Sequence, residues 1–200
     1  MTLRQLFSFL IGVLFIALIV EIFNNRPINT TVLIQAGHEG RIIGNTGSIN
    51  GKYKEVDWNV LVAKEIEKEL KKNGIDVVRV GADIPIANAR IAVAIHFDGS
   101  TKPCSTGASI GYDPYHSRAK RTALRWKKIY KNYFPFKWHK ENFTKNLSEY
   151  YGFNRVNTEK GFLVLELGEI TCNEQIKWLE PRLDLIAIKI ADFIMDELDR

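Results

Sequence analysis

The chain has 200 residues and a formal net charge of +5. Without its apolar N-terminal segment it is long enough for one domain with a substantial core, and too short for two comfortable domains. Its two cysteines, Cys104 and Cys172, are too few for a disulfide framework and lack the CxxC spacing of a zinc or redox site. They leave open either one bridge in an oxidising compartment or a pair of free thiols.

The N-terminal segment is apolar from Leu6 to Val20 apart from Ser8. Its length lies between that of a signal-peptide core and that of a comfortable membrane span. Arg4 precedes the run and favours an orientation with the N-terminus inside. Because no small-residue cleavage site follows, we expect residues 1–24 to form a retained signal anchor, a transmembrane helix. The alternatives are a cleaved signal peptide and a buried core helix.

This anchor predicts that the rest of the chain lies outside the cytoplasm. The protein would be membrane-anchored in the periplasm or at the cell surface, or secreted if the segment is cleaved. Residues 25–30 are polar, contain Pro27 and read as a linker. Residues 31–200 are then expected to form one domain.

Strands and helices alternate along that domain. Apolar runs predict strands, a 3.6-residue apolar period predicts helices, and a loop rich in glycine and asparagine spans residues 41–54. The expected strands cover residues 31–36, 76–80, 91–95, 107–112 and 162–165, and the expected helices cover residues 56–72, 117–133, about 141–151 and 181–198. This order indicates an α/β fold, a single domain with a mainly parallel, twisted sheet that is buried on both sides and flanked by helices.

Four polar residues stand where such a fold would bring them together. His38 and His96 follow the first and third strands, Glu55 precedes the first long helix, and Glu166 directly follows an apolar strand. Ligands of parallel sheets gather beyond the carboxyl ends of the strands. Taken singly, each residue has an ordinary structural interpretation: a hydrogen-bonded histidine, a helix N-terminal acid favoured by the macrodipole, or a glutamate paired with Arg155 or a lysine.

Together the four residues suit zinc-dependent hydrolysis. Two imidazoles and one carboxylate leave a tetrahedral zinc ion with an open position for water, and a free glutamate nearby can take the proton of that water. A carboxylate at the end of a buried strand is costly unless it is paired, neutralised or near a cation.

Short motifs surround these residues. The first strand runs into Gly-His-Glu-Gly at 37–40, and the others are Glu-Val-Asp-Trp-Asn at 55–59, Ala-Ile-His at 94–96, Gly-Ala-Ser-Ile-Gly-Tyr at 107–112, Leu-Glu-Leu-Gly at 165–168 and Asn-Glu at 173–174. In this order and spacing, the region from about Thr31 to the carboxyl terminus resembles the zinc-dependent N-acetylmuramoyl-L-alanine amidases. These enzymes cleave peptidoglycan.

The resemblance implies a peptidoglycan hydrolase that cleaves the amide bond between N-acetylmuramic acid and L-alanine. It implies that Zn²⁺ is the cofactor, that His38, Glu55 and His96 are its ligands, and that Glu166 is the catalytic residue. Glu166 would take a proton from the attacking water and pass it to the departing amine.

Some positions extend this pattern and others depart from it. Asn59 and Asp98 are candidates for orienting the two histidines. Ala36 and Glu39 replace the proline and glycine that usually flank the first histidine. Glu39 could therefore crowd the site or bind substrate.

A basic and aromatic stretch extends from Ser117 to Lys145, where ten Lys or Arg accompany one acid, Glu141. It is typical either of an amphipathic helix with a solvated lysine face and a buried aromatic face, which we favour, or of a surface for anionic wall polymers or sugars. Interleaved basic and aromatic residues also suit single-stranded nucleic acid, which the exporting segment disfavours.

Two further functions remain open at this point. One is a catalytically weak cell-wall-binding or regulatory module with the same fold. The other is a different zinc peptidase, such as a carboxypeptidase, although Arg41 stands where its usual His-x-x-Glu ligand pair needs a glutamate. Peptidoglycan and the membrane are the expected partners, without nucleic acid, and any protein activator is unknown.

Overall fold

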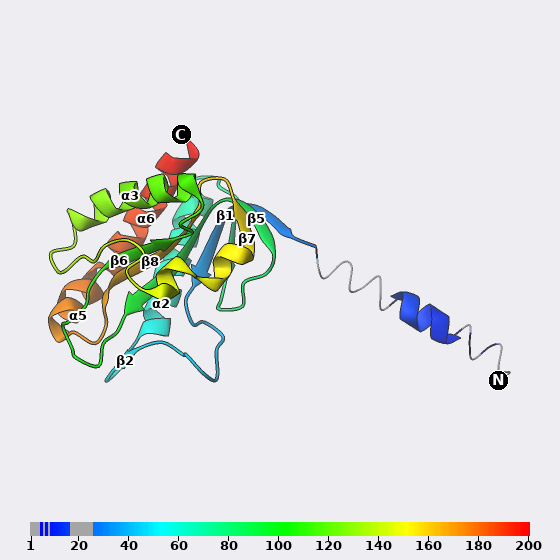
Figure 1. Cartoon of the computed structure of the whole chain (residues 1–200), viewed down its shortest axis with the longest axis horizontal. Coiled ribbons are helices and arrows are strands. Elements are labelled where there is room, and N and C mark those ends of the chain that lie inside the picture. The colour runs from blue at the N-terminus through cyan, green and yellow to red at the C-terminus, as the bar shows by residue number, and fades with distance from the viewer. Residues whose placement is uncertain (1–4, 6, 8, 17–25) are drawn as a thin grey trace.

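The computed structural model describes residues 5, 7, 9–16 and 26–200 (Figure 1). Residues 9–16 are helical and exposed. The expected anchor, residues 1–24, lies largely outside the described residues. Among the residues that are described, none belongs to a helix with both the length and the hydropathy needed to cross a membrane.

A mixed, mainly parallel sheet forms the centre of the domain. Its strand order is β4-β1-β5-β8-β6, and β7 pairs with the first part of β5. All pairings are parallel except β6 with β8. The strands are β1 (Ile28–Ala36), β4 (Val77–Val80), β5 (Ala87–Asp98), β6 (Ser109–Tyr112), β7 (Val156–Thr158) and β8 (Phe162–Glu169). The predicted α/β class with a mainly parallel sheet is confirmed.

The two faces of the sheet are covered unequally. One face packs into a large apolar cluster with the longer helices, which are α2 (Glu55–Lys72), α3 (Ser117–Lys131), α5 (Asn173–Leu179) and α6 (Leu183–Leu198). The other face forms a smaller cluster with Ile84, Leu147 and Val156, from loops and short elements. The sheet is therefore buried on both sides, as expected, but its long helices gather on one side. The thinly covered face is the one that opens into the site.

Several local elements differ from the sequence expectation. Short helices α4 (Lys145–Ser148) and η1 (Tyr151–Asn154) replace the single helix expected at residues 141–151. Helix α5 and strand β7 were not predicted, and Pro181 lies in a 3-10 turn, η2 (Glu180–Arg182), rather than in the first turn of α6. The loop predicted at residues 41–54 contains a small hairpin of β2 (Ile49–Asn50) and β3 (Tyr53–Lys54). These elements are too short for periodicity to reveal them.

The first part of the basic stretch, α3, is an amphipathic helix with a buried aromatic face, as we favoured. Trp126 and Tyr130 of α3 are fully buried, and the Tyr130 hydroxyl donates to the Leu167 carbonyl at 2.8 Å. Three of the cations on this helix are paired: Arg118 with Glu159, Arg125 with Glu197 and Lys127 with Glu141.

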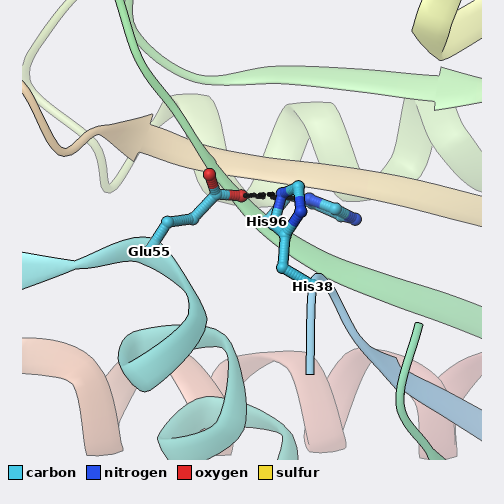
Figure 2. A group of neighbouring side chains, drawn as sticks. All are labelled: His38, Glu55 and His96. Atoms are coloured by element: carbon cyan, nitrogen blue, oxygen red, sulfur yellow. Dashed lines mark hydrogen bonds and ion pairs between the residues drawn. The ribbon is translucent and has the colours of Figure 1, made fainter. Parts of the chain in front are cut away.

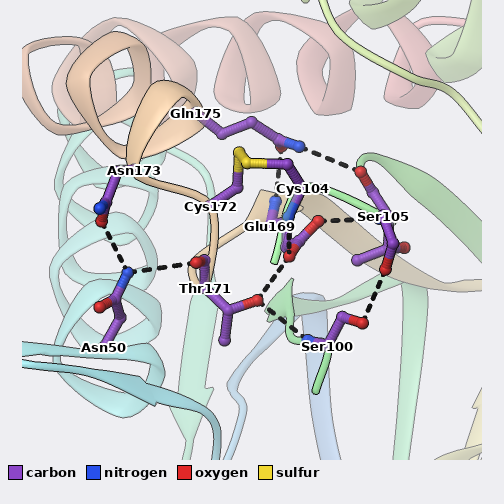
Figure 3. Close-up of a disulfide and its surroundings, with 10 residues drawn as sticks. Asn50, Ser100, Cys104, Ser105, Glu169, Thr171, Cys172, Asn173 and Gln175 are labelled. Atoms are coloured by element: carbon purple, nitrogen blue, oxygen red, sulfur yellow. Dashed lines mark hydrogen bonds between the residues drawn. A yellow bond between two sulfur atoms is a disulfide. The ribbon is translucent and has the colours of Figure 1, made fainter. Parts of the chain in front are cut away.

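The two cysteines form a disulfide that joins the loop after β5 to the loop after β8 (Figure 3). Beside it, the fully buried Glu169 accepts hydrogen bonds from the backbone N–H groups of Cys104 and Thr106, each at 2.8 Å, and from the Thr171 hydroxyl at 2.5 Å. The cross-link and the buried carboxylate together fix these two loops at the carboxyl ends of the central strands.

Candidate metal centre and active site

His38 lies in the tight turn that follows β1. Its backbone has a φ of 65°, an uncommon conformation for a residue with a side chain and one that is often found at functional sites. The preceding Gly37 allows His96 to approach, because a Cβ atom at this position would lie 2.3 Å from His96 Cε1. Any larger residue at position 37 would displace the ring of His96.

Glu55 is the first residue of α2, and the backbone around it holds its carboxylate in place. Oε2 accepts from Ser48 N at 2.9 Å, and Oε1 accepts from Phe97 N at 3.3 Å. Gly47 allows the loop before β2 to lie against this carboxylate, since a Cβ atom at position 47 would lie 3.2 Å from Glu55 Oε2. A charge at the first turn of a helix is also favoured by the helix dipole.

His96 and Glu166 are neighbours on adjacent strands. His96 lies near the end of β5, and the parallel register of β5 with β8 places it directly beside Glu166. Because side chains of paired residues in register point to the same face, both project from the thinly covered side of the sheet.

The two imidazoles converge on the carboxylate of Glu55 (Figure 2). Oε1 of Glu55 lies 3.0 Å from His38 Nε2 and 3.0 Å from His96 Nδ1. One ligand atom from each of the three residues lies within 4.8 Å of the others. The side chains are buried, with 7%, 4% and 9% of His38, Glu55 and His96 exposed.

This donor set suits a divalent metal. Two imidazole nitrogens and one carboxylate oxygen this close together can hold a divalent metal ion. The carboxylate of Glu55 accepts from two backbone N–H groups and faces both imidazoles, and a cation bound among the three residues would balance its negative charge.

The electrostatics of the three residues are strongly coupled. Burial raises the pKa of Glu55, but hydrogen bonds from His38 and His96 outweigh it and hold the pKa below its ordinary value. Burial lowers the pKa of His38, but the hydrogen bond and charge of Glu55 more than offset this, so the pKa is raised. The negative charge of Glu55 therefore favours a positive charge within the cluster.

Glu166 lies in the same cavity without a partner for one of its oxygens. The cavity has a volume of about 380 Å³ and is lined by His38, Glu55, His96 and Glu166 among other residues. Glu166 Oε2 is buried and accepts no hydrogen bond in the described part of the chain. Burial raises the pKa of Glu166, and the negative charges of Glu55 and Asp98 raise it further.

The structure thus brings all four predicted residues to one cavity. The alternative pairing of Glu166 with Arg155 or a lysine is wrong: no ion pair of Glu166 is found among the described residues, its Oε2 has no partner, and Arg155 Nε donates to the Ile84 carbonyl at 2.9 Å. Glu39 does not crowd the cavity. It forms an ion pair with Arg79 and is not among the residues that line the pocket.

The residues expected to orient the histidines make other contacts. Asn59 donates to the Gly37 carbonyl at 3.0 Å and to Glu55 Oε1 at 3.4 Å. Asp98 accepts from the Thr106 hydroxyl at 2.5 Å. Neither hydrogen-bonds to an imidazole, so the expectation that they orient the histidines is wrong.

Two groups that the sequence analysis missed contact the outer ring nitrogens. His38 Nδ1 donates to the Asn45 carbonyl at 2.9 Å, and His96 Nε2 lies 3.4 Å from the Tyr150 hydroxyl. A backbone carbonyl has no sequence signature. Tyr150 lies 54 residues from His96 along the chain, so only the folded chain reveals the contact.

Residues 32–196 match the family model described as N-acetylmuramoyl-L-alanine amidase. The chain belongs to this family. Its membership confirms the resemblance read from the short motifs, and with it the predicted enzyme class, a peptidoglycan amidase. No curated protein sequence matches the chain.

Known structures share the fold of this amidase. An N-acetylmuramoyl-L-alanine amidase from Clostridium difficile 630 is 22% identical, with a TM-score of 0.63 over 86% of this chain and 97% of the other. The catalytic domain of the amidase CwlV from Bacillus (Paenibacillus) polymyxa var. colistinus is 24% identical, with a TM-score of 0.64 over 85% and 98%. The CwlD amidase from Clostridioides difficile, solved in complex with the GerS lipoprotein, is 18% identical, with a TM-score of 0.65 over 86% and 99%.

Proposed function

We propose that this amidase uses zinc, bound by His38, Glu55 and His96, to cleave the bond between N-acetylmuramic acid and L-alanine in peptidoglycan. The observation that carries the proposal is the placement of three converging ligand atoms beside a carboxylate whose buried oxygen lacks a partner. When bound, zinc supplies Lewis acidity, which makes an attacking water more acidic and polarises an amide carbonyl.

The residues of the chain supply orientation and proton transfer. Glu55 is held by the backbone N–H groups of Ser48 and Phe97, so its carboxylate stays in position while substrate enters. Glu166 acts as general base and then as general acid, taking a proton from the attacking water and giving it to the amine of L-alanine. Its position beside His96 in the β5–β8 register puts its carboxyl next to the proposed metal ligands, where this proton transfer would take place.

The open cavity supports a polymeric substrate. Its lining includes Gln35 and Arg41, from β1 and the loop after it, together with Asn146, Tyr150 and Tyr151. Polar and aromatic side chains of the lining, such as Arg41 and the exposed Tyr151, can contact the sugar and the peptide of a peptidoglycan strand, because aromatic faces stack on sugars and polar groups bind amides.

Digestion of purified peptidoglycan tests the proposal. The zinc-loaded protein should release new amino termini on L-alanine, identified by mass analysis of the fragments, without new reducing sugar ends. Removal of zinc with a chelator should stop the release, and added zinc should restore it. New free carboxyl-terminal amino acids instead of alanine amino termini would identify a carboxypeptidase and overturn the assignment.

We also propose that residues 1–24 anchor the enzyme to the membrane, with its catalytic domain outside the cytoplasm. The disulfide between Cys104 and Cys172 supports the extracytoplasmic location, because structural disulfides persist in oxidising compartments. Fractionation of cells expressing the full chain should place it in the membrane fraction with the catalytic domain accessible to external protease. Release into the medium would indicate a cleaved signal peptide.

A further inference from the structure

A buried glutamine connects two tyrosines behind His96. Gln35, on β1, is 0% exposed. Its Oε1 accepts from the Tyr150 hydroxyl at 2.7 Å, and its Nε2 donates to the Tyr151 hydroxyl at 3.2 Å. The Tyr150 oxygen in turn lies 3.4 Å from His96 Nε2. These contacts form a continuous chain from the imidazole to the loop that contains Ala82, whose carbonyl accepts from the Tyr151 hydroxyl.

The Ala82 carbonyl fixes the direction of this chain, because a carbonyl can only accept a hydrogen bond. Tyr151 gives its single hydroxyl proton to Ala82 and must therefore accept from the amide nitrogen of Gln35. The carbonyl of Gln35 then faces Tyr150 and takes its hydroxyl proton. Tyr150 has no proton left for His96, so its oxygen accepts and His96 Nε2 must carry the hydrogen.

In a neutral ring, a proton on Nε2 leaves the lone pair of His96 on Nδ1, the nitrogen that lies 3.0 Å from Glu55 Oε1, so a cation rather than a hydrogen would lie between these two atoms. His38 reaches the same result by a shorter route, since its Nδ1 donates directly to the Asn45 carbonyl and leaves Nε2 facing Glu55. The two histidines thus direct different ring nitrogens, Nε2 of His38 and Nδ1 of His96, toward Glu55 Oε1. Each imidazole is oriented by a backbone carbonyl, one directly and one through three side chains.

We propose that Tyr150 and Gln35 are positioning residues that fix the proton of His96 on Nε2 and so present Nδ1 to the metal. This inference rests on the proposed function, because it concerns the zinc-loaded site. Without a metal, the Glu55 carboxylate competes for a proton on Nδ1 of neutral His96. With a cation at Nδ1, the Nε2–H is the remaining proton of the ring, and Tyr150 is its acceptor.

Zinc affinity of purified variants tests the inference, measured by competition with a chromogenic chelator. Tyr150→Phe removes the hydroxyl and keeps the ring, and zinc affinity should fall about tenfold or more. Gln35→Met keeps the side-chain length and removes both hydrogen bonds, and should also weaken zinc binding. Tyr151→Phe should have a smaller effect. Gln35 can still accept from Tyr150 in this variant, but nothing prevents its side-chain amide from flipping by 180°, so the orientation is only partly lost.

Tyr130→Phe is the matched control. It removes another buried tyrosine hydroxyl that donates to a backbone carbonyl, Leu167, on the far side of the sheet. It should lower the free energy of unfolding while leaving zinc affinity unchanged. If Tyr150 had only a structural role, Tyr150→Phe would also lower the free energy of unfolding and leave zinc affinity unchanged.

Nitrogen-15 NMR of the zinc-loaded protein gives a second readout that does not depend on activity. The Nε2–H of His96 should exchange slowly with solvent in the wild type and faster in Tyr150→Phe and Gln35→Met. Wild-type zinc affinity in both variants would overturn the inference. If the wild type binds zinc but does not cleave peptidoglycan, the proposed function fails while the inference about His96 stands.

Discussion

Glu166 and Glu169 lie three residues apart on β8, and their surroundings are opposite. Glu169 is fully buried beside the disulfide and accepts hydrogen bonds from two backbone N–H groups and a hydroxyl. Glu166 faces the cavity, and its buried Oε2 accepts no hydrogen bond from the described residues. Because side chains alternate along a strand, the two carboxylates project to opposite faces of the same sheet.

One strand thus carries a carboxylate that stabilises the fold, Glu169, and a carboxylate available for chemistry, Glu166. A buried carboxylate is stabilised when every oxygen is hydrogen-bonded, as in Glu169, and it then has no capacity left for a substrate proton. An oxygen without a partner costs stability and keeps that capacity. The region around Glu169 (Figure 3) should therefore control stability, and the region around Glu166 should control turnover.

The largest expected effect is on turnover in Glu166→Gln. The amide has nearly the same shape but cannot take a proton, so the rate of peptidoglycan cleavage should fall by about 10²–10⁴-fold. Zinc content and the free energy of unfolding should not decrease, because the substitution removes an unpaired buried charge. Wild-type turnover in this variant would show that another group moves the proton.

In the region around Glu169, the disulfide should make the largest contribution to the free energy of unfolding. It joins residues 68 positions apart, and closing a loop of that length is expected to stabilise the fold by about 4 kcal/mol. The double variant Cys104→Ala, Cys172→Ala should lose this amount in urea unfolding while keeping wild-type zinc affinity. A large loss of zinc affinity at unchanged stability would reverse the contrast between the two regions.

Glu169→Gln should lose somewhat less stability. Its amide nitrogen would face N–H donors, leaving buried donors unsatisfied at a cost of about 3 kcal/mol. Urea unfolding measures this loss, and turnover per folded molecule should remain near that of the wild type. The same substitution at two positions on one strand thus gives opposite results, which makes Glu169→Gln the matched control for Glu166→Gln.

The smallest effect concerns Glu141, a half-buried carboxylate paired with Lys127. Burial raises the pKa of Glu141, but the hydrogen bond and charge of Lys127 outweigh it and lower the pKa. A lowered folded-state pKa adds stability above the ordinary pKa of glutamate, and this stability is lost as the pH falls through the folded-state pKa.

Lys127→Met should therefore reduce stability at neutral pH by less than about 1 kcal/mol. The difference from the wild type should vanish in acid, as measured by urea midpoints across the acidic range. A difference that is constant with pH would mean that Lys127 acts by packing rather than by charge. The Lys127–Glu141 pair thus shows how much stability a partly exposed carboxylate contributes, for comparison with Glu166 and Glu169.

The sequence predicted the residues that stand next to strand ends. His38, His96 and Glu166 directly follow or end apolar runs, and a parallel sheet brings such positions to one edge. Glu55 was predicted because it opens a helix with a strong apolar period. Local pattern places these residues, and the resemblance of the surrounding motifs to the amidase family assigned their roles.

Contacts between distant segments could not be predicted. Tyr150 and Gln35 are 115 residues apart, and they meet because the segment after β6 folds back over the thinly covered face. The sequence does not decide between a disulfide and two free thiols, since two cysteines in a sequence carry no information on their distance in space. Helix α5 is seven residues long, too short to show a helical period.

A crystal structure of the zinc-loaded protein with anomalous scattering data tests the central claim most directly. We predict one zinc ion bound by His38 Nε2, His96 Nδ1 and a carboxylate oxygen of Glu55, with a solvent ligand in hydrogen-bond reach of Glu166. Zinc bound elsewhere, or Glu166 as a fourth protein ligand that leaves no place for water, would contradict the account.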